Sequence, residues 1–445
     1  MIKITNTLTG NKEEFKPYNQ NSVLMYVCGI TPYDDAHIGH GRVYISFDVI
    51  SRLFRLFGYD VQYCRNFTDI DDKLLNKAEA EFGDRLRYQE ISERYIARYH
   101  QDVAALGCLP PTYEPRVTRC IPEIIRFIQG LIDAGKAYES EGDVYFSIAT
   151  FPAYGALSKR HVEDLQVGAR VQVSDKKRDP LDFALWKSEP EGTFWKSPWG
   201  YGRPGWHIEC SAMAKQFLGE HIDIHGGGLD LIFPHHENEI AQSEALYGAP
   251  FARYWVHNGM VRIDQEKMSK SLGNFFTLRD LFKQFDPMVL RYYIIAHHYR
   301  APLDFAFDDI KAIEKSYKRL VRIFNDVIAD PELDLTAVAK SDVAQRMIDF
   351  LADDINTPGA FGVLFDALGD IQKNESELRL IKGILQHIFG LSLQPIAEQE
   401  VVMTTEIEQK LAEREEARLA KDWARADAIR QQLVDMGVPV NDKRS

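Results

Sequence analysis

The feature that most constrains this fold is an apolar run over residues 23–28 that stops at a loop. The run is rich in β-formers, and it breaks at Gly29 and Pro32, residue types that strands avoid. From His40 onward the apolar residues recur with the spacing of one helix face, and a second strand is expected over 61–67. A strand, a helix and a strand make a βαβ unit, whose parallel strands need a right-handed crossover. The sequence therefore predicts an α/β domain built on a parallel sheet.

The loop after the first strand lies where parallel sheets bind ligands, beyond the carboxyl ends of their strands. It carries Cys28 at the end of the strand, and His37 and His40 at the start of the helix. Free N–H groups and the helix dipole favour phosphate there. The loop matches neither the G-x-G-x-x-G nor the Walker A pattern, so the sequence indicates neither a dinucleotide-binding fold nor a P-loop. An isolated pair of histidines more often caps or packs than binds, so the pair alone does not decide the function.

Composition narrows the class of protein. A chain of 445 residues with 45% hydrophobic residues can form about three domains with sizeable cores. Its N-terminus has no apolar signal segment, and no apolar run approaches the ~20 residues that cross a bilayer. The five cysteines form no C-x-x-C pair and no disulfide pattern. Reduced thiols fit a cytosolic protein. We therefore expect a cytoplasmic protein with no membrane contact, whose net charge of −13 disfavours indiscriminate nucleic-acid binding.

Four residues could form a zinc site. His235 and Glu239 are four apart on an expected helix, so both side chains project from one face. Cys28 and Cys210 each follow a strand at the same expected cleft, and two thiolates, an imidazole and a carboxylate suit tetrahedral Zn²⁺. Free cysteines are as often simply buried apolar residues, so spacing alone leaves the two alternatives even. A zinc protease is excluded, because Ile240 stands where H-E-x-x-H needs its second histidine.

A short basic loop offers a second polar cluster. Lys267 and Lys270 flank small residues after an expected strand, and their ammonium groups could neutralise a triphosphate. A basic pentamer alone is more often a solvated loop. The presence of His37 and His40 favours phosphate binding over a solvated loop, because the two histidines and the two lysines could bind the same polyphosphate.

Several motifs resemble one enzyme family. His-Ile-Gly-His at 37–40 and Lys-Met-Ser-Lys-Ser at 267–271 are similar to the paired signatures of class I aminoacyl-tRNA synthetases. Within that class, four further stretches resemble cysteinyl-tRNA synthetases: 25–29, 66–73, 205–213 and 233–239. The resemblance extends from Met1 to about Pro439. It implies a Rossmann-like catalytic domain split by an insertion, followed by an α-helical bundle and a small C-terminal domain.

The expected domains follow from this resemblance and from the residue pattern. They are a first catalytic half (1–115), a connective insertion (116–200), a second catalytic half (201–280), a stem-contact region (281–310), a helical tRNA-binding bundle (311–392) and a C-terminal anticodon-recognition segment (393–445). Helical spacing predicts bundle helices over 308–328, 341–354, 358–372 and 375–390. One further helix is expected over 405–436.

The resemblance also implies an activity, ATP-dependent ligation of cysteine to tRNA(Cys) through a cysteinyl-adenylate. The implied partners are ATP, L-cysteine and tRNA(Cys). We expect the chain itself to be a monomer. The implied catalytic residues are His37, His40, Lys267 and Lys270, and ATP would contact these together with Gly39 and Asp230. The implied contacts to cysteine come from Gly29, Thr68 and Trp206. One zinc ion per chain, held by Cys28, Cys210, His235 and Glu239, would select the substrate thiolate, and Mg²⁺ would accompany ATP.

Two other functions stay open on the sequence. A ligase joining cysteine to a small amine, as in mycothiol-pathway relatives, would use the same active site, but those relatives lack a full anticodon domain. A silent tRNA-binding protein would not need the two histidines and two lysines. Family members usually continue past the position of Val440 into a basic, Trp-containing tail, and the sequence departs from the family pattern there.

Overall fold

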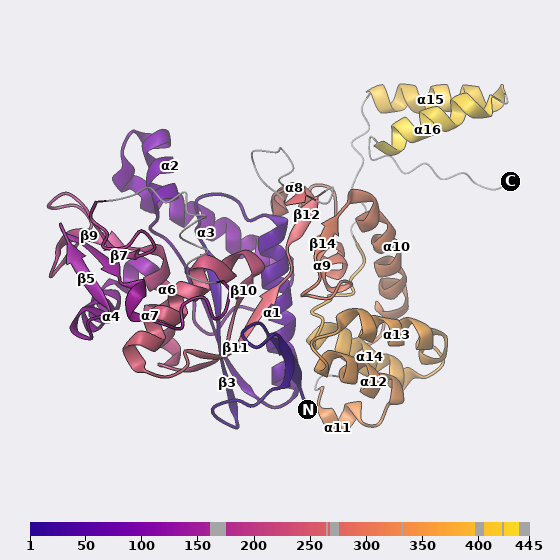
Figure 1. The fold of residues 1–445 in the computed structure, drawn as a ribbon. Helices are drawn as coiled ribbons and strands as arrows, with labels where there is room; N and C mark the ends of the chain where they lie inside the picture. Colours follow the sequence, from indigo (N-terminus) through magenta and orange to yellow (C-terminus); the bar gives the residue numbers. More distant parts are fainter. Residues whose placement is uncertain are drawn as a thin grey trace. The chain divides into compact units, whose positions relative to one another are not determined.

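The computed structural model describes residues 1–160, 175–263, 266–267, 276–330, 333–396, 405–420 and 422–435 (Figure 1). The chain divides into two compact units, Met1–Pro395 and Ile396–Ser445. No described helix has the length and apolar character needed to cross a membrane.

A four-stranded parallel sheet forms the centre of the first unit. Its order is β11 (Ala252–Asn258), β10 (Ile222–Gly228), β3 (Ser22–Ile30) and β4 (Asp60–Phe67). Met25 of β3 lies opposite Ile224 of β10 on one side and Tyr63 of β4 on the other. Strands from before and after the insertion thus pair directly, which confirms the predicted split α/β domain.

Helices cover both faces of this sheet. α1 (Ile38–Leu56) follows β3, and its Phe47 ring comes so close to Gly226 that a Cβ there would lie 2.3 Å from it. Tyr26 and Cys28 belong to the core on the opposite face, together with α6 (Trp206–Leu218) and α7 (Glu237–Tyr247). Figure 1 shows α1 on one side of the sheet and α6 and α7 on the other. Cys28 therefore faces α6, the helix that carries Cys210.

The N-terminal hairpin of β1 (Lys3–Asn6) and β2 (Asn11–Glu14) is attached to the edge strand β11. Asn6 is buried, and its side-chain oxygen accepts from the backbone N–H groups of Trp255 (3.0 Å) and Leu8 (3.1 Å). The N–H of Thr7 donates to the carbonyl of Trp255 at 2.8 Å. These bonds hold the hairpin against β11.

The insertion forms its own sheet. After β4 come α2 (Asp72–Phe82), α3 (Tyr88–Ala105) and α4 (Ile121–Asp133). A five-stranded antiparallel sheet follows, in the order β5 (Ala137–Ser140), β6 (Asp143–Phe146), β7 (Phe183–Ser188), β9 (Gly200–Pro204) and β8 (Trp195–Ser197). Strand β9 leads into α6, which returns the chain to the central sheet.

Beyond the central sheet the chain becomes mostly helical. A small sheet joins β13 (Glu266–Lys267), β12 (Val261–Ile263) and β14 (Leu303–Phe305), with α8 (Leu278–Phe282) and α9 (Pro287–Ile295) between β13 and β14. The bundle helices are α10 (Phe307–Phe324), α11 (Leu335–Val338), α12 (Asp342–Ala352), α13 (Thr357–Ile371) and α14 (Glu375–His387). The predicted bundle is present, with the short α11 added to the four expected helices.

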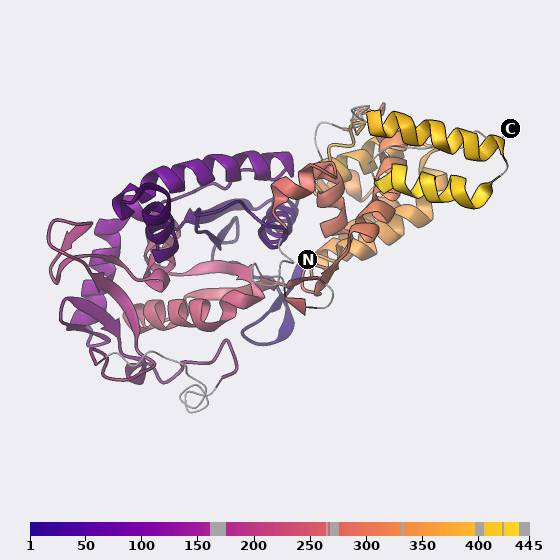
Figure 2. The same ribbon diagram turned by 90° about the horizontal axis from the view of Figure 1, so that it is seen from above.

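The second unit is a helical hairpin, α15 (Thr405–Leu419) and α16 (Trp423–Asp435), seen most clearly in Figure 2. The prediction of one continuous helix over 405–436 is wrong. The first helix ends at Leu419. Asp422 begins the second, because its carboxylate accepts from the N–H of Arg425 at 3.1 Å, as an N-cap does. The two helices pack through a small apolar cluster of Ile407, Leu411, Ile429 and Leu433.

Candidate active site and metal centre

A cavity of about 400 Å³ opens at the carboxyl ends of β3 and β10. Its volume is in the range of small-molecule sites. Seven of the residues proposed from sequence lie in its wall, namely Cys28, Gly29, His37, Gly39, His40, Trp206 and Asp230. The topology therefore gathers both catalytic halves around one space.

His37 and His40 cap the helix that begins at this cavity. His37 Nδ1 lies 3.3 Å from the N–H of His40, and His40 Nδ1 lies 3.2 Å from the N–H of His37. Their rings stack with centroids 3.6 Å apart. Burial lowers the pKa of His40 well below its ordinary value, and His37 and Lys73 lower it further. His40 is therefore a neutral imidazole at the start of α1. Its Nδ1 accepts from the N–H of His37, so its Nε2 carries the proton and can donate to a phosphate oxygen.

The chain that follows the basic loop lies close to these histidines. Lys267 lies in β13, paired with Arg262 of β12, although its side chain lies outside the described residues. Lys270 lies in 268–275, which is also outside them. Directly after this stretch, Leu278 donates its N–H to the carbonyl of Ala36 at 2.7 Å, and Phe276 accepts from the N–H of Ile38 at 3.2 Å. Residues that follow the basic segment in the chain are therefore hydrogen-bonded to the histidine loop.

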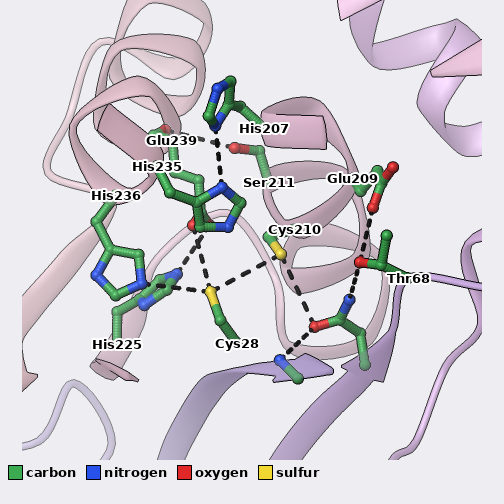
Figure 3. A network of polar contacts seen from close by, with 12 residues as sticks. Cys28, Thr68, His207, Glu209, Cys210, Ser211, His225, His235, His236 and Glu239 are labelled. Carbon is green, nitrogen blue, oxygen red and sulfur yellow. Dashed lines mark hydrogen bonds and ion pairs between the residues drawn. The ribbon is translucent and has the colours of Figure 1, made fainter. Parts of the chain in front are cut away.

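The four proposed zinc ligands meet at the base of the cavity (Figure 3). One ligand atom from each of Cys28, Cys210, His235 and Glu239 lies within 4.8 Å of the other three. The two sulfurs are 3.8 Å apart, Cys28 Sγ is 3.5 Å from Glu239 Oε1, and His235 Nε2 is 3.1 Å from the same oxygen. All four side chains are buried. Two sulfurs, one nitrogen and one oxygen at such separations fit a tetrahedral Zn²⁺.

Burial controls the charge of this cluster. It raises the pKa of the Cys28 thiol and of the Glu239 carboxyl, and it lowers the pKa of the His235 imidazole. Neighbouring Cys210 and Glu239 raise the Cys28 pKa further. Two thiolates and a carboxylate would therefore repel one another unless a cation lay between them, which is the electrostatic condition of a metal site.

More buried histidines surround the ligands, and sequence reasoning missed them. His225 Nε2 is 2.8 Å from Glu239 Oε2, His236 Nε2 is 3.3 Å from Cys28 Sγ, and His207 Nδ1 is 2.9 Å from His235 Nδ1. Burial lowers the pKa of both His207 and His225 to about 3. Neutral imidazoles in these places can hydrogen-bond to metal ligands and orient them.

Cys28, His225, His236 and Glu239 form an overlapping group of possible ligands. In that group His225 is already hydrogen-bonded to Glu239, and Cys210 and His235 would be left without a role. The first set uses both thiols and leaves His225 and His236 as supporting hydrogen-bond donors. We therefore favour Cys28, Cys210, His235 and Glu239 as the ligand set.

The predicted helical position of His235 is confirmed, although the turn that holds it is wider than an α-helical turn. Helix α7 starts at Glu237, and His235 lies in the preceding turn, Ile232–His236, where Phe233 has extended backbone angles. The imidazole still reaches Glu239, because the turn leads straight into α7. Helical i, i+4 spacing therefore brings the two side chains together, as the sequence predicted.

The proposed cysteine-binding residues differ in their exposure. The Trp206 ring is 41% exposed and stacks on His235 with centroids 4.3 Å apart. Gly29 lies so close to β4 that a Cβ would come within 1.6 Å of the Asn66 carbonyl oxygen. Thr68 is 4% exposed, and its hydroxyl donates to Glu209 Oε2 at 2.9 Å. Trp206 and Gly29 thus border the cavity, while Thr68 lies behind its wall.

Several polar residues of the cavity wall, Lys73 and Asp34 among them, had no place in the sequence interpretation. Lys73, at the start of α2, has its ammonium 5.2 Å from the centre of the Tyr33 ring. Asp34 lies in the loop before α1. Their spacing from the histidines carries no periodic signal, although Asp71, which caps α2 by accepting from the Lys73 N–H at 2.8 Å, marks the helix start in the sequence.

Comparison with known proteins identifies the family. Residues 14–315 match the family of class I (C) tRNA synthetase catalytic domains, and residues 402–445 match the cysteinyl-tRNA ligase anticodon binding domain. A cysteine–tRNA ligase from a Sulfurihydrogenibium species is 45% identical over 99% of this chain and 98% of its own length. The chain belongs to the cysteine–tRNA ligase family. A cysteine–tRNA ligase from Geobacter sulfurreducens has the same identity and coverage.

Membership of the cysteine–tRNA ligase family makes the chain a class I aminoacyl-tRNA synthetase, an enzyme, as the motifs predicted. The fold agrees with that class. Mycobacterium tuberculosis methionyl-tRNA synthetase, solved with methionyl-adenylate, superposes with a TM-score of 0.61 at 14% identity, covering 84% of this chain and 92% of that one.

Proposed function

We propose that this enzyme joins cysteine to tRNA(Cys) in two steps and selects cysteine by its sulfur. The observation that carries the proposal is the buried cluster of Cys28, Cys210, His235 and Glu239 at the base of a cavity whose wall contains His37 and His40. In the first step the cysteine carboxylate attacks the α-phosphate of ATP, and pyrophosphate leaves as cysteinyl-adenylate forms. In the second, the terminal ribose hydroxyl of the tRNA attacks the adenylate carbonyl, and AMP leaves.

The first step needs stabilisation of charge on the phosphoryl oxygens rather than a nucleophilic side chain. We assign this role to His37 and His40 at the helix N-terminus and to Lys267 and Lys270, with Mg²⁺ accompanying the ATP. Gly39 would let the nucleotide approach the helix backbone, and Asp230 would accept from the ribose hydroxyls. The hydrogen bonds from Phe276–Leu278 to the histidine loop support a shared role for the two signatures.

Amino-acid selection is assigned to the base of the cavity. Cys28, Cys210, His235 and Glu239 would hold a zinc ion, which binds a thiolate far better than a serine hydroxyl. Trp206 and Gly29 would enclose the amino acid beside it, and Thr68 would fix the wall through Glu209. A purely steric pocket would separate cysteine from serine poorly, because the two are near-isosteres. Recognition of the sulfur would let the enzyme reject serine without a separate editing site.

We assign tRNA recognition to the helical parts of the chain. Residues 281–310 and the bundle over 311–392 would contact the stem, and 393–445 would read the anticodon. The match of 402–445 to an anticodon binding domain supports this assignment.

The test is cysteine-dependent ATP–pyrophosphate exchange, followed by transfer of labelled cysteine to tRNA(Cys). We expect both activities, with serine failing in the exchange. Exchange without transfer to tRNA, together with ligation to a small amine, would favour the alternative acceptor. Absence of exchange with zinc-loaded protein would overturn the proposal.

A further inference from the structure

A line of three polar contacts connects the N-terminal hairpin to the metal cluster from outside the cavity. Thr7 Oγ1 is 2.8 Å from His257 Nδ1, His257 Nε2 is 2.8 Å from His236 Nδ1, and His236 Nε2 is 3.3 Å from Cys28 Sγ. Both imidazoles are buried, at 3% and 0% exposure, and Thr7 is half-buried. Neither Thr7 nor His257 is part of the cavity wall. The line reaches the cavity at Cys28, which is part of its wall.

The direction of these hydrogen bonds follows from the chemistry at the sulfur end. A cysteine that ligates a metal is a thiolate, which accepts hydrogen bonds and donates none. A neutral imidazole has one N–H, so His236 must donate from Nε2 and accept at Nδ1. His257 must then donate from Nε2, which leaves its Nδ1 as an acceptor. Among the described residues, Thr7 supplies the donor to that atom.

The backbone holds the Thr7 hydroxyl in place for this bond. Its N–H donates to the carbonyl of Trp255, two residues before His257 on β11, and Asn6 accepts from the Trp255 N–H. The hairpin is thus fixed to the same strand that carries His257. The short distance from Thr7 Oγ1 to His257 Nδ1 is a product of this attachment.

We propose that Thr7 is a positioning residue of the metal centre. By donating to His257 Nδ1, its hydroxyl sets the tautomers of His257 and His236 so that an N–H points at the Cys28 sulfur. The inference rests on the proposed function only in taking Cys28 as a metal ligand. Hydrogen-bond partners outside a ligand set commonly change metal affinity by about 10–100-fold. Since Thr7 acts through two imidazoles, we expect the lower end of that range.

Two substitutions separate the hydroxyl from simple packing. Thr7→Val keeps the shape of the side chain and removes the donor, whereas Thr7→Ser keeps the donor and removes a methyl group. Thr9→Val is the matched control on the same hairpin, because Thr9 is exposed and its hydroxyl contacts Asn6 and Glu13 rather than a histidine. Each variant is made in the full chain and loaded with zinc.

The first measurement is the rate of zinc release to a chelator. We expect Thr7→Val to release zinc about 10-fold faster than wild type, with Thr7→Ser and Thr9→Val close to wild type. The second is ¹⁵N NMR of labelled histidine, where wild type should show His257 and His236 protonated at Nε2, and Thr7→Val should show a changed His257 tautomer population. Unaltered zinc release and unaltered histidine signals in Thr7→Val would overturn the inference.

Other outcomes are equally decisive. If Thr7→Ser is as impaired as Thr7→Val, the methyl group and not the hydroxyl is responsible, and the inference fails. If wild type itself has no affinity for zinc, the proposed metal centre fails first. If wild type binds zinc and Thr7→Val releases it at the wild-type rate, the role of Thr7 is overturned and the proposed metal centre is not.

Discussion

The Nε2 atom of His225 lies 2.8 Å from Oε2 of Glu239, and neither side chain is exposed to solvent. The other oxygen of Glu239 faces His235 and Cys28. A carboxylate held in this way presents one oxygen to the metal position and bonds through the second to a residue behind it. His225 is thereby a support for a proposed ligand, and it lies on β10 rather than on the helix that carries the ligand.

We predict that His225→Phe weakens zinc binding about 10–100-fold, because it keeps the stacking on Trp255 and removes the hydrogen bond to Glu239. His225→Gln should recover part of the affinity, since its amide can donate. Affinity is measured by competition with a chromophoric chelator. His221→Gln is the control, because His221 is half-buried and its Nδ1 contacts the Pro250 carbonyl, away from the metal cluster. Equal affinity in His225→Phe and wild type would contradict the assigned role.

Cys210→Ser should remove one thiolate from the metal centre. We expect the zinc content of the purified protein to fall, and cysteine-dependent pyrophosphate exchange to drop by more than about 100-fold, beyond the usual effect of partners outside the ligand set. In cobalt-substituted protein, the intensity of sulfur-to-cobalt absorption should decrease. Cys108→Ser, at a half-buried cysteine outside the cluster, should keep both zinc and activity. Full zinc occupancy and normal exchange in Cys210→Ser would exclude Cys210 as a ligand.

Asp102 of α3 should make stability depend on pH. It is 2% exposed, and burial raises its pKa from 3.8 to about 6 although Arg279 lies 3.1 Å away. The folded protein therefore binds this proton more tightly than the unfolded chain does, so the contribution of Asp102 to stability falls as pH rises from about 4 to 6. Relative to Asp102→Asn, the free energy of unfolding of wild type should fall by about 2 to 3 kcal/mol between pH 4 and 6.

Urea denaturation at several pH values measures that difference. Asp308→Asn serves as the control, since the Asp308 side chain is 94% exposed, and its pH dependence should run parallel to that of wild type. The free energy of unfolding of wild type minus that of Asp102→Asn should fall between pH 4 and 6. If this difference stays flat or rises, the pKa of Asp102 is not raised.

The α15–α16 hairpin should affect tRNA charging without affecting adenylate formation. Leu433 is fully buried in the small cluster that joins the two helices, and Leu433→Ser should cost about 3 kcal/mol of hairpin stability. We expect KM for tRNA to rise about 10-fold, equivalent to about 1.4 kcal/mol, with pyrophosphate exchange unchanged. Leu419→Ser, at a side chain that is 79% exposed, should behave as wild type. An unchanged KM for tRNA in Leu433→Ser would argue against anticodon contact by this hairpin.

Local pattern determined much of this protein from sequence alone. The β3–α1–β4 unit, the histidine pair at a helix start and the bundle helices were predictable, because strand alternation, helical spacing and capping depend on residues close in the chain. The break at Asp422 was missed although capping is also local, since the mixed charges around it continue the helical pattern. Membership of the family also came from short motifs.

Only the tertiary structure decided how the site is assembled. Cys28 and Cys210 are 182 positions apart in the sequence, on either side of the insertion. Their sulfurs meet because β3 packs directly against α6. His225 and His257 lie on neighbouring strands, and Thr7 comes from a hairpin attached to the sheet edge. Such contacts depend on strand order and on packing between distant segments, which no local periodicity encodes. The sequence thus identified the chemical groups of the metal cluster, and the sheet determined which neighbours support them.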